Sequence, residues 1–161
     1  MKRIVIFLFA LALSGMTAQA QGGAQSKSGK PALVVFVVGI DNHQVEDYLA
    51  SLVGNELARA GKYEVLSRSE AVKRKLAELR EYEDSGHVDD RELIAWGRQS
   101  NVSAICLVHV VRFDEYLFSA QLTDVRSGKL AGSGEYAIPT ASGADLKKAA
   151  SAIAAQLQRK N

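Results

Sequence analysis

The stretch AICLVHVVRFDEYLFSAQLTDVRSGKLAGSGEYAI, residues 104–138, decides the fold. It divides into three strand-like segments with polar turns between them, namely Ala104 to Val111, Glu115 to Thr123 and Lys129 to Ile138. Apart from Leu117, the middle segment alternates polar residues with an apolar set, namely Tyr116, Phe118, Ala120 and Leu122. Since successive strand residues lie on opposite faces, one face packs on a core and the other lies nearer to water. The stretch therefore predicts an antiparallel meander.

An apolar run upstream predicts a strand that is covered on both faces. Leu33 to Val38 reads LVVFVV, is rich in β-branched residues and has no polar alternation. That pattern is typical of a strand near the middle of a sheet. Asp41 and Gln44 follow with the spacing of a capping box, in which side chains satisfy free N–H groups at a helix start. We therefore expect a helix capped by Asp41 that ends near Gly61, where a residue without Cβ adopts the left-handed conformation.

Shorter patterns predict the remaining elements. Tyr63 to Leu66 predicts a second strand, and Asp89 to Gln99 predicts a helix. Another helical pattern has its apolar positions at Val72, Leu76 and Leu79. It follows capping hydroxyls at Ser67 to Ser69 and stops near Gly86. The last helix has an apolar stripe at Leu146, Ala149, Ala150, Ile153, Ala154 and Leu157. The predicted fold is a compact α/β sandwich of helices on a mixed sheet, in the order β-α-β-α-α-β-β-β-α, forming one domain over residues 32–161.

Residues 1–20 have the form of a secretory signal. Met1 to Arg3 is a basic start, and Ile4 to Leu13 is an uncharged apolar run. Ala18 to Ala20 then supplies the small residues that a cleavage site needs. The apolar run is too short to span a bilayer as a helix, which takes about 20 residues. Met16 stands where a bacterial lipoprotein carries its lipidated cysteine. We therefore expect cleavage before Gln21, a flexible Gly/Ser-rich leader over residues 21–31, no lipid and a periplasmic location.

The net charge gives no argument for a partner once this signal is removed. The 161 residues include 20 Lys and Arg against 18 Asp and Glu, a formal net charge of +2. Lys2 and Arg3 account for the excess, and no acidic residue precedes Asp41, so the predicted mature chain is neutral. Nucleic acids and anionic membranes attract basic proteins. The charge therefore gives no argument for binding to an anionic membrane, and we expect no nucleic-acid partner and no membrane span after removal of the signal.

The side chains that most often carry catalysis are few in this chain. It has three histidines and one cysteine. Cys106 and His109 are three residues apart in one predicted strand, so their side chains point to opposite faces and form no nucleophile–base pair. The motifs of serine hydrolases, zinc proteases and nucleotide-binding proteins are absent from the sequence. We expect a protein that is not an enzyme and has no cofactor.

One cluster leaves a metal site open as an alternative. His43 and Asp47 are spaced to share a helix face, with Asp41 and Glu46 close by, and this donor set could hold a divalent cation. That interpretation would make the protein a small metal-dependent enzyme. In the other interpretation the carboxylates serve the helix start, where capping and the helix dipole favour acidic residues. No second His or Cys stands at ligand spacing, which favours the second interpretation.

A strongly charged helical segment is the candidate surface for a protein partner. Residues 73–84 read KRKLAELREYED. Most charged helix faces are simply solvated, and a docking surface is the alternative interpretation. In the docking interpretation the contacts come from this helix and the loop after it, at Arg74, Lys75, Glu78, Glu81, Tyr82 and His87.

Several pieces of the chain, taken in order, carry a family resemblance. After the apolar first strand come a strand ending in Arg68, a helix ending at Gly97 before an apolar strand, and an L-x-D-V-x-[ST]-G turn that contains Asp124 and Gly128. Over roughly residues 32–158 the sequence resembles the envelope domain shared by the curli secretion protein CsgG, the amino-terminal domain of TolB and the penicillin-binding-protein activator LpoB. The turn is the most specific of these pieces.

The resemblance implies a fold similar to an anticodon-binding domain, without a catalytic site. It implies that Arg68, Gly97, Asp124 and Gly128 are structural and that the partners are other envelope proteins. The protein is then an exported, non-enzymatic binding domain, an accessory or regulator of cell-envelope machinery. The alternative within the family is a subunit of a CsgG-like outer-membrane secretion or ring assembly, although the short mature chain lacks room for pore hairpins and Met16 replaces the lipidated cysteine.

Overall fold

The computed structural model describes residues 29–66, 70–85 and 90–159, with residues 82–85 described by their backbone alone. The strands are β1 (Ala32–Val38), β2 (Glu64–Val65), β3 (Ala104–Arg112), β4 (Tyr116–Asp124) and β5 (Lys129–Ile138). The helices within these residues are α1 (His43–Arg59), α2 (Glu70–Ser85), α3 (Asp90–Gln99) and α4 (Gly143–Leu157). Their order along the chain is the predicted one, and the α/β class is confirmed. In the part of the chain described, no helix is both long and apolar enough to cross a membrane.

The five strands form one mixed sheet in the order β2-β1-β3-β4-β5. β1 is parallel to both of its neighbours, β2 and β3. β3, β4 and β5 form the predicted antiparallel meander, with Val111 opposite Leu117 and Leu117 opposite Ala137. The register of β4 against β5 shifts between Leu122 and Thr123. This meander is the half of the sheet farther from β2.

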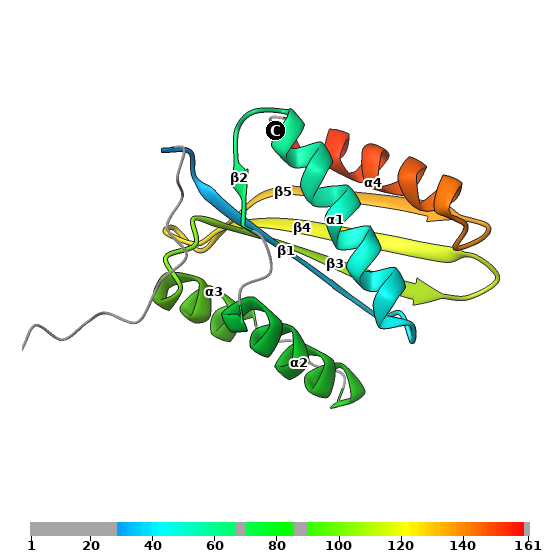
Figure 1. Cartoon of the computed structure of the whole chain (residues 1–161), viewed down its shortest axis with the longest axis horizontal. Coiled ribbons are helices and arrows are strands. Elements are labelled where there is room, and N and C mark those ends of the chain that lie inside the picture. Colours follow the sequence, from blue (N-terminus) through cyan, green and yellow to red (C-terminus); the bar gives the residue numbers. More distant parts are fainter. Residues whose placement is uncertain (1–28, 67–69, 86–89, 160–161) are drawn as a thin grey trace, which may run out of the picture.

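Helices pack on both faces of the sheet, as Figure 1 shows: α1 and α4 lie on one face, and α2 and α3 on the other. The residues of β1 alternate between the two cores, because Leu33 and Val37 pack under α1 while Val34, Phe36 and Val38 pack under α2 and α3. A strand with both faces covered needs apolar residues at every position, which explains the unbroken LVVFVV run.

The two cores cover different parts of the sheet. The α1/α4 core extends over the whole meander and includes Cys106, Phe118, Leu122 and Ile153. The α2/α3 core covers β1 and the first part of β3, and its aromatic contact is an edge-to-face pair of Phe36 with Trp96, whose ring centroids are 5.4 Å apart. α2 and α3 therefore cover only part of their face of the sheet.

The remainder of that face is uncovered by helices in the described structure, and we call it the open face. Strand alternation places on it the residues of β4 and β5 that point away from the α1/α4 core, together with the end of β3. Its members are His109, Val111, Leu117, Ser119, Gln121, Thr123, Leu130, Ser133, Glu135 and Ala137. None of these is fully buried.

Two glycines of β5 allow the end of α4 to approach the sheet closely. A Cβ at Gly132 would lie 2.5 Å from the carbonyl oxygen of Leu157, and one at Gly134 would lie 2.9 Å from the Cβ of Gln156. The Gln156 side chain accepts a hydrogen bond from the Glu135 N–H at 3.1 Å and donates one to the Glu135 carbonyl at 2.9 Å. The side-chain amide thus takes the place of a neighbouring strand at the outer edge of β5.

Two details differ from the sequence expectations. Asn42, rather than Asp41, is the N-cap of α1, and its side chain accepts from the Gln44 N–H at 3.0 Å. Both residue types cap well, so the pattern alone did not separate them. The second strand is shorter than Tyr63 to Leu66, since only Glu64 and Val65 pair with β1. The predicted capping hydroxyls at 67–69 and the helix end near Gly86 lie outside the described residues.

Candidate functional site

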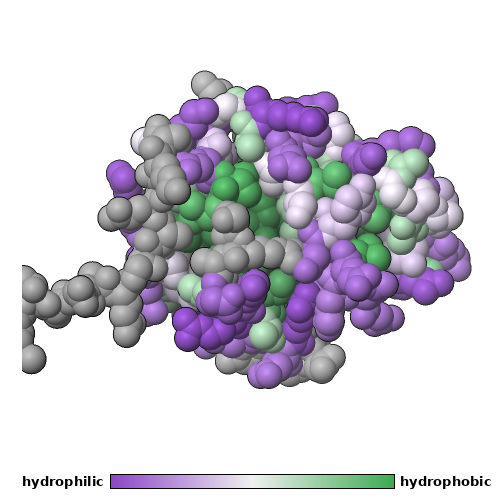
Figure 2. Space-filling model, in the orientation of Figure 1, coloured by the Kyte–Doolittle hydropathy of each residue, from purple (hydrophilic) through white to green (hydrophobic). Residues whose placement is uncertain are grey.

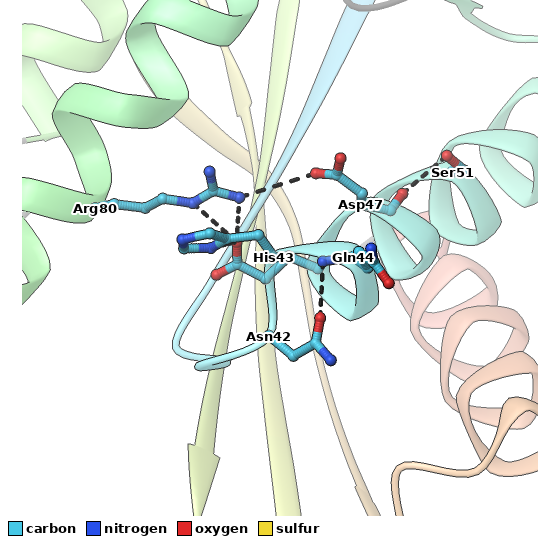
Figure 3. Close-up of polar contacts among 7 residues, drawn as sticks. Asn42, His43, Gln44, Asp47, Ser51 and Arg80 are labelled. Carbon is cyan, nitrogen blue, oxygen red and sulfur yellow. Dashed lines mark hydrogen bonds and ion pairs between the residues drawn. The ribbon is translucent and has the colours of Figure 1, made fainter.

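The first turn of α1 and the middle of α2 meet in a polar cluster around a buried carboxylate. Glu46 on α1 is only 2% exposed. Arg80 on α2 donates to Glu46 Oε2 from Nε, at 2.9 Å, and from Nη2. His43 Nδ1 lies 3.2 Å from the same oxygen. Figure 3 shows Arg80 extending from α2 toward this turn of α1, with His43 beside it.

The position of this cluster follows from the sheet. β2 pairs with only Ala32 and Leu33 of β1, so the rest of the outer edge of β1 has no strand neighbour among the described residues. α1 and α2 pack on opposite faces of β1, and Glu46 and Arg80 join them beside that edge. A buried carboxylate needs a cation and hydrogen bonds to offset its lost hydration, and Arg80 supplies both. The ion pair therefore links α1 to α2 across the outer edge of β1.

The three metal-ligand candidates lie around this ion pair. His43 is largely exposed and contacts Glu46, while Asp47 Oδ1 is 3.8 Å from Arg80 Nη2. Asp41 is exposed in the loop before α1. Among the described residues no group of three or more His, Cys, Asp and Glu side chains is placed to hold a metal ion. The guanidinium of Arg80 supplies the positive charge at this place, and the metal site stays a prediction.

The candidate partner residues on α2 have different environments. Arg74, Glu78 and Glu81 are exposed. Lys75 is only 6% exposed, and its Nζ donates to the Glu78 carboxylate at 3.0 Å. A lysine whose stem is buried in this way gives a partner little contact surface. The side chain of Tyr82 and the whole of His87 lie outside the described residues.

The described residues of the family motifs support helix packing and a turn between strands. A Cβ at Gly97 would lie 2.9 Å from Ile105 Cδ1, so a glycine lets α3 pack closely on β3. In the turn between β4 and β5, Asp124 accepts from both the N–H and the hydroxyl of Ser127, each at 2.7 Å. These two hydrogen bonds lower the pKa of Asp124. Gly128 has a φ of 67°, the left-handed conformation that favours glycine. Arg68 lies outside the described residues.

The single cysteine is buried in the α1/α4 core. Cys106 is fully buried, and this burial raises the pKa of its thiol to about 12. Nucleophilic cysteines need an accessible thiolate, which this environment disfavours. His109 is partly buried and, as predicted, lies on the opposite face of β3.

A cavity of about 880 Å³ lies beside β2, between α1 and the start of α2. Figure 2 shows hydrophobic residues gathered in a hollow at this place. Val34, Val65, Leu66 and Val72 give it an apolar lining, with Lys30 and Glu64 among its polar residues. Residues 67–69 follow Leu66 directly and lie outside the described structure, so the cavity supports no assignment of a ligand.

The end of the open face carries an exposed apolar surface that sequence reasoning missed. Val111 is 44% exposed at the end of β3, and Phe113 is 72% exposed in the three-residue turn to β4. Leu117 and Ala137 lie beside Val111 in the same cross-strand row. A phenylalanine within the polar turn RFDE was the available signal, because turns between strands favour small polar residues and a large aromatic ring there has no core to enter.

Comparison with known proteins supports the fold. No protein-family model matches the sequence, and no curated protein matches it. The C-terminal domain of LpoB from Escherichia coli is similar in structure, with a TM-score of 0.50 and 19% identity over 73% of this chain and 89% of that one. At this identity the likeness shows the fold alone, which is LpoB-like.

Two other solved structures align at lower scores. TolB from Acinetobacter baumannii has a TM-score of 0.49 and 12% identity, over 75% of this chain. The chain spans a quarter of the length of that TolB structure. The lipoprotein GNA1162 from Neisseria meningitidis has a TM-score of 0.46 and 17% identity, over 67% of this chain and 78% of that one. The CsgG part of the resemblance stays a prediction.

Proposed function

We propose that this protein is an exported, non-enzymatic domain of the periplasm that binds another envelope protein, as an accessory or regulator of cell-envelope machinery. The observation that carries the proposal is the fold shared with the C-terminal domain of LpoB. The secretory form of residues 1–20 supports it independently, since a cleaved signal would deliver the chain to the compartment of the envelope.

The uses of the ionisable side chains agree with a binding role. Glu46 and Arg80 join two helices, and Asp124 holds a turn. Cys106 is a core residue with a raised pKa. Each of these groups is committed to the fold, whereas catalysis requires groups that converge on a substrate. The surface that remains open, on β3 to β5, is suited to contact with a macromolecule.

In vivo crosslinking tests the proposal. The full chain, carrying a C-terminal tag, is expressed in its native host, treated with a membrane-permeable amine crosslinker and purified under denaturing conditions. We expect one envelope protein to be enriched reproducibly and to bind the purified mature domain. A tagged periplasmic protein of similar size is the control for nonspecific capture. Recovery of the uncrosslinked monomer alone, in repeated experiments, would contradict the proposed function.

A further inference from the structure

We infer that the partner docks on the end of the open face, at the turn between β3 and β4, through a segment that carries an apolar side chain flanked by lysine or arginine. This inference rests on the proposed function and adds to it the surface and the chemistry of the partner. The docking surface, which we call the hairpin patch, consists of Val111, Phe113, Asp114, Glu115, Leu117, Glu135 and Ala137.

The apolar part of the patch is exposed without a structural reason in the monomer. Phe113 extends from a turn whose backbone is closed by a hydrogen bond from the Phe113 N–H to the Glu115 carbonyl at 2.9 Å. That bond does not involve the aromatic ring, so the turn does not need a phenylalanine. Val111, Leu117 and Ala137 extend the apolar surface across three strands. Exposed aromatic side chains beside aliphatic ones are typical of the centre of a binding surface.

The charged part of the patch has one sign. Asp114 and Glu115 are exposed in the turn, and Glu135 is exposed one cross-strand row beyond Ala137. None of these three carboxylates has an ion-pair partner among the described residues. Two other carboxylates, Glu56 and Glu70, are each paired with a nearby cation.

The nearest cation on the hairpin lies toward the other face. Arg112 is directed over the ring of Tyr116, with its Cζ 5.5 Å from the ring centroid. Alternation places both residues on the α1/α4 side of the sheet, opposite Val111 and Leu117. The strand residues of the open face include Glu135 and the partly buried His109, which share a cross-strand row with Ser119, and no lysine or arginine. An apolar surface bordered by unpaired carboxylates is complementary to an apolar side chain flanked by basic residues.

Site-specific photo-crosslinking locates the contact. A photo-reactive amino acid is introduced at position 113 of the full chain and, as a matched control, at position 74 on the exposed face of α2, and both variants are irradiated in the native host. We expect the partner to crosslink from position 113 and not from position 74. The crosslinked segment, read by mass spectrometry, should contain an apolar residue next to lysine or arginine.

Binding of the purified partner then measures the contribution of each part of the patch. We expect Phe113→Ser to weaken the affinity by about tenfold or more, as for an aromatic at the centre of an interface. Glu115→Lys with Glu135→Lys should weaken it further at low salt and reverse its dependence on ionic strength, because the patch would then repel a basic segment. Lys147→Glu, which reverses an exposed charge on α4 instead, should leave the affinity unchanged. Circular dichroism and thermal unfolding check that each variant folds.

The outcomes separate this inference from the proposed function. If the partner binds the wild-type domain but crosslinks from position 74, or if Phe113→Ser binds as tightly as wild type, the hairpin patch is wrong while the binding function stands. An acidic contact segment would overturn the chemistry inferred for the partner. If no protein crosslinks from either position and none co-purifies, the proposed function fails and this inference fails with it.

Discussion

At the scale of single residues, Glu46 and Arg80 are the most informative pair. The Glu46 carboxylate is buried and depends on Arg80 for its positive charge. We expect Arg80→Leu to lower the free energy of unfolding by about 2–4 kcal/mol, somewhat less than a fully buried pair because Arg80 is partly exposed. Urea unfolding of the purified mature domain measures the change.

The double variant distinguishes a buried charge from a lost contact. Glu46→Leu combined with Arg80→Leu removes both charges, and replacing a buried ion pair by apolar residues is often close to neutral. We therefore expect the double variant to be more stable than Arg80→Leu alone. Equal stability of the two variants would show that the cost comes from lost packing instead of from the unpaired carboxylate.

Asp124 gives a prediction about pH. Its hydrogen bonds to Ser127 lower the pKa of the carboxyl in the folded state. A lowered folded-state pKa means that the carboxylate adds stability above its unfolded pKa of about 3.9, and that this contribution is lost as the pH falls through the lower, folded-state value. Asp124→Asn should lower the unfolding free energy at pH 7 by about 0.5–1 kcal/mol, at the low end for hydrogen bonds to a charged group because solvent screens the turn.

The pH dependence of this difference is the decisive readout. The stabilities of wild type and Asp124→Asn, compared by urea unfolding from pH 7 downward, should begin to converge as the pH falls below the unfolded-state pKa of about 3.9, and the convergence should be complete below the lower pKa of the folded carboxyl. Ser127→Ala is the matched control, because it removes the hydroxyl donor and keeps the backbone N–H. A difference that is constant over the whole pH range would mean that the charge on Asp124 does not stabilise the turn.

At the scale of elements, the contact of α4 with β5 can be tested through Gln156. Its amide makes two hydrogen bonds to the backbone of Glu135 at the sheet edge. Gln156→Ala should accelerate hydrogen exchange of the Glu135 amide and lower stability by about 1 kcal/mol, since both hydrogen bonds are partly exposed. Lys147→Ala, at an exposed position on the same helix, should change neither quantity.

The elements themselves were largely predictable because their patterns are periodic. Alternation in residues 116–123 predicted β4 and its buried face, and the unbroken apolar run at 33–38 predicted a strand between two layers. The choice of Asn42 over Asp41 as the cap depends on backbone dihedrals that the residue types do not specify. Lys75 was a candidate partner contact because it lies in a charged helical segment, whereas its long stem packs against the molecule.

The candidate site was less predictable than the fold, since its parts come from separate elements. Glu46 and Arg80 are 34 residues apart, and nothing in the sequence brings them together. The hairpin patch depends on which part of the sheet α2 and α3 leave uncovered. That coverage is a property of packing between elements, so an exposed Val111 has the same sequence pattern as a buried one.

At the scale of the whole molecule, export is the property to test first. The mature protein should be recovered from the periplasm with a mass that corresponds to a chain beginning at Gln21. Replacing the basic start, with Lys2→Glu and Arg3→Glu, should slow processing and leave precursor in the cell, because a signal needs its positive n-region. A mature protein that retains residues 1–20 would contradict the cleaved signal.

The ion pair between α1 and α2 has a consequence for how the protein unfolds. The sheet divides the apolar residues into two cores, and α2 contributes only Val72, Leu76 and Leu79 to the smaller one, so its apolar contacts alone would resist detachment weakly. Its Arg80 is held by Glu46 in the opposite layer, and detachment of α2 would leave that carboxylate without its cation. Local opening of α2 therefore costs the pairing of a buried charge in the other layer, and we expect the two layers to unfold together.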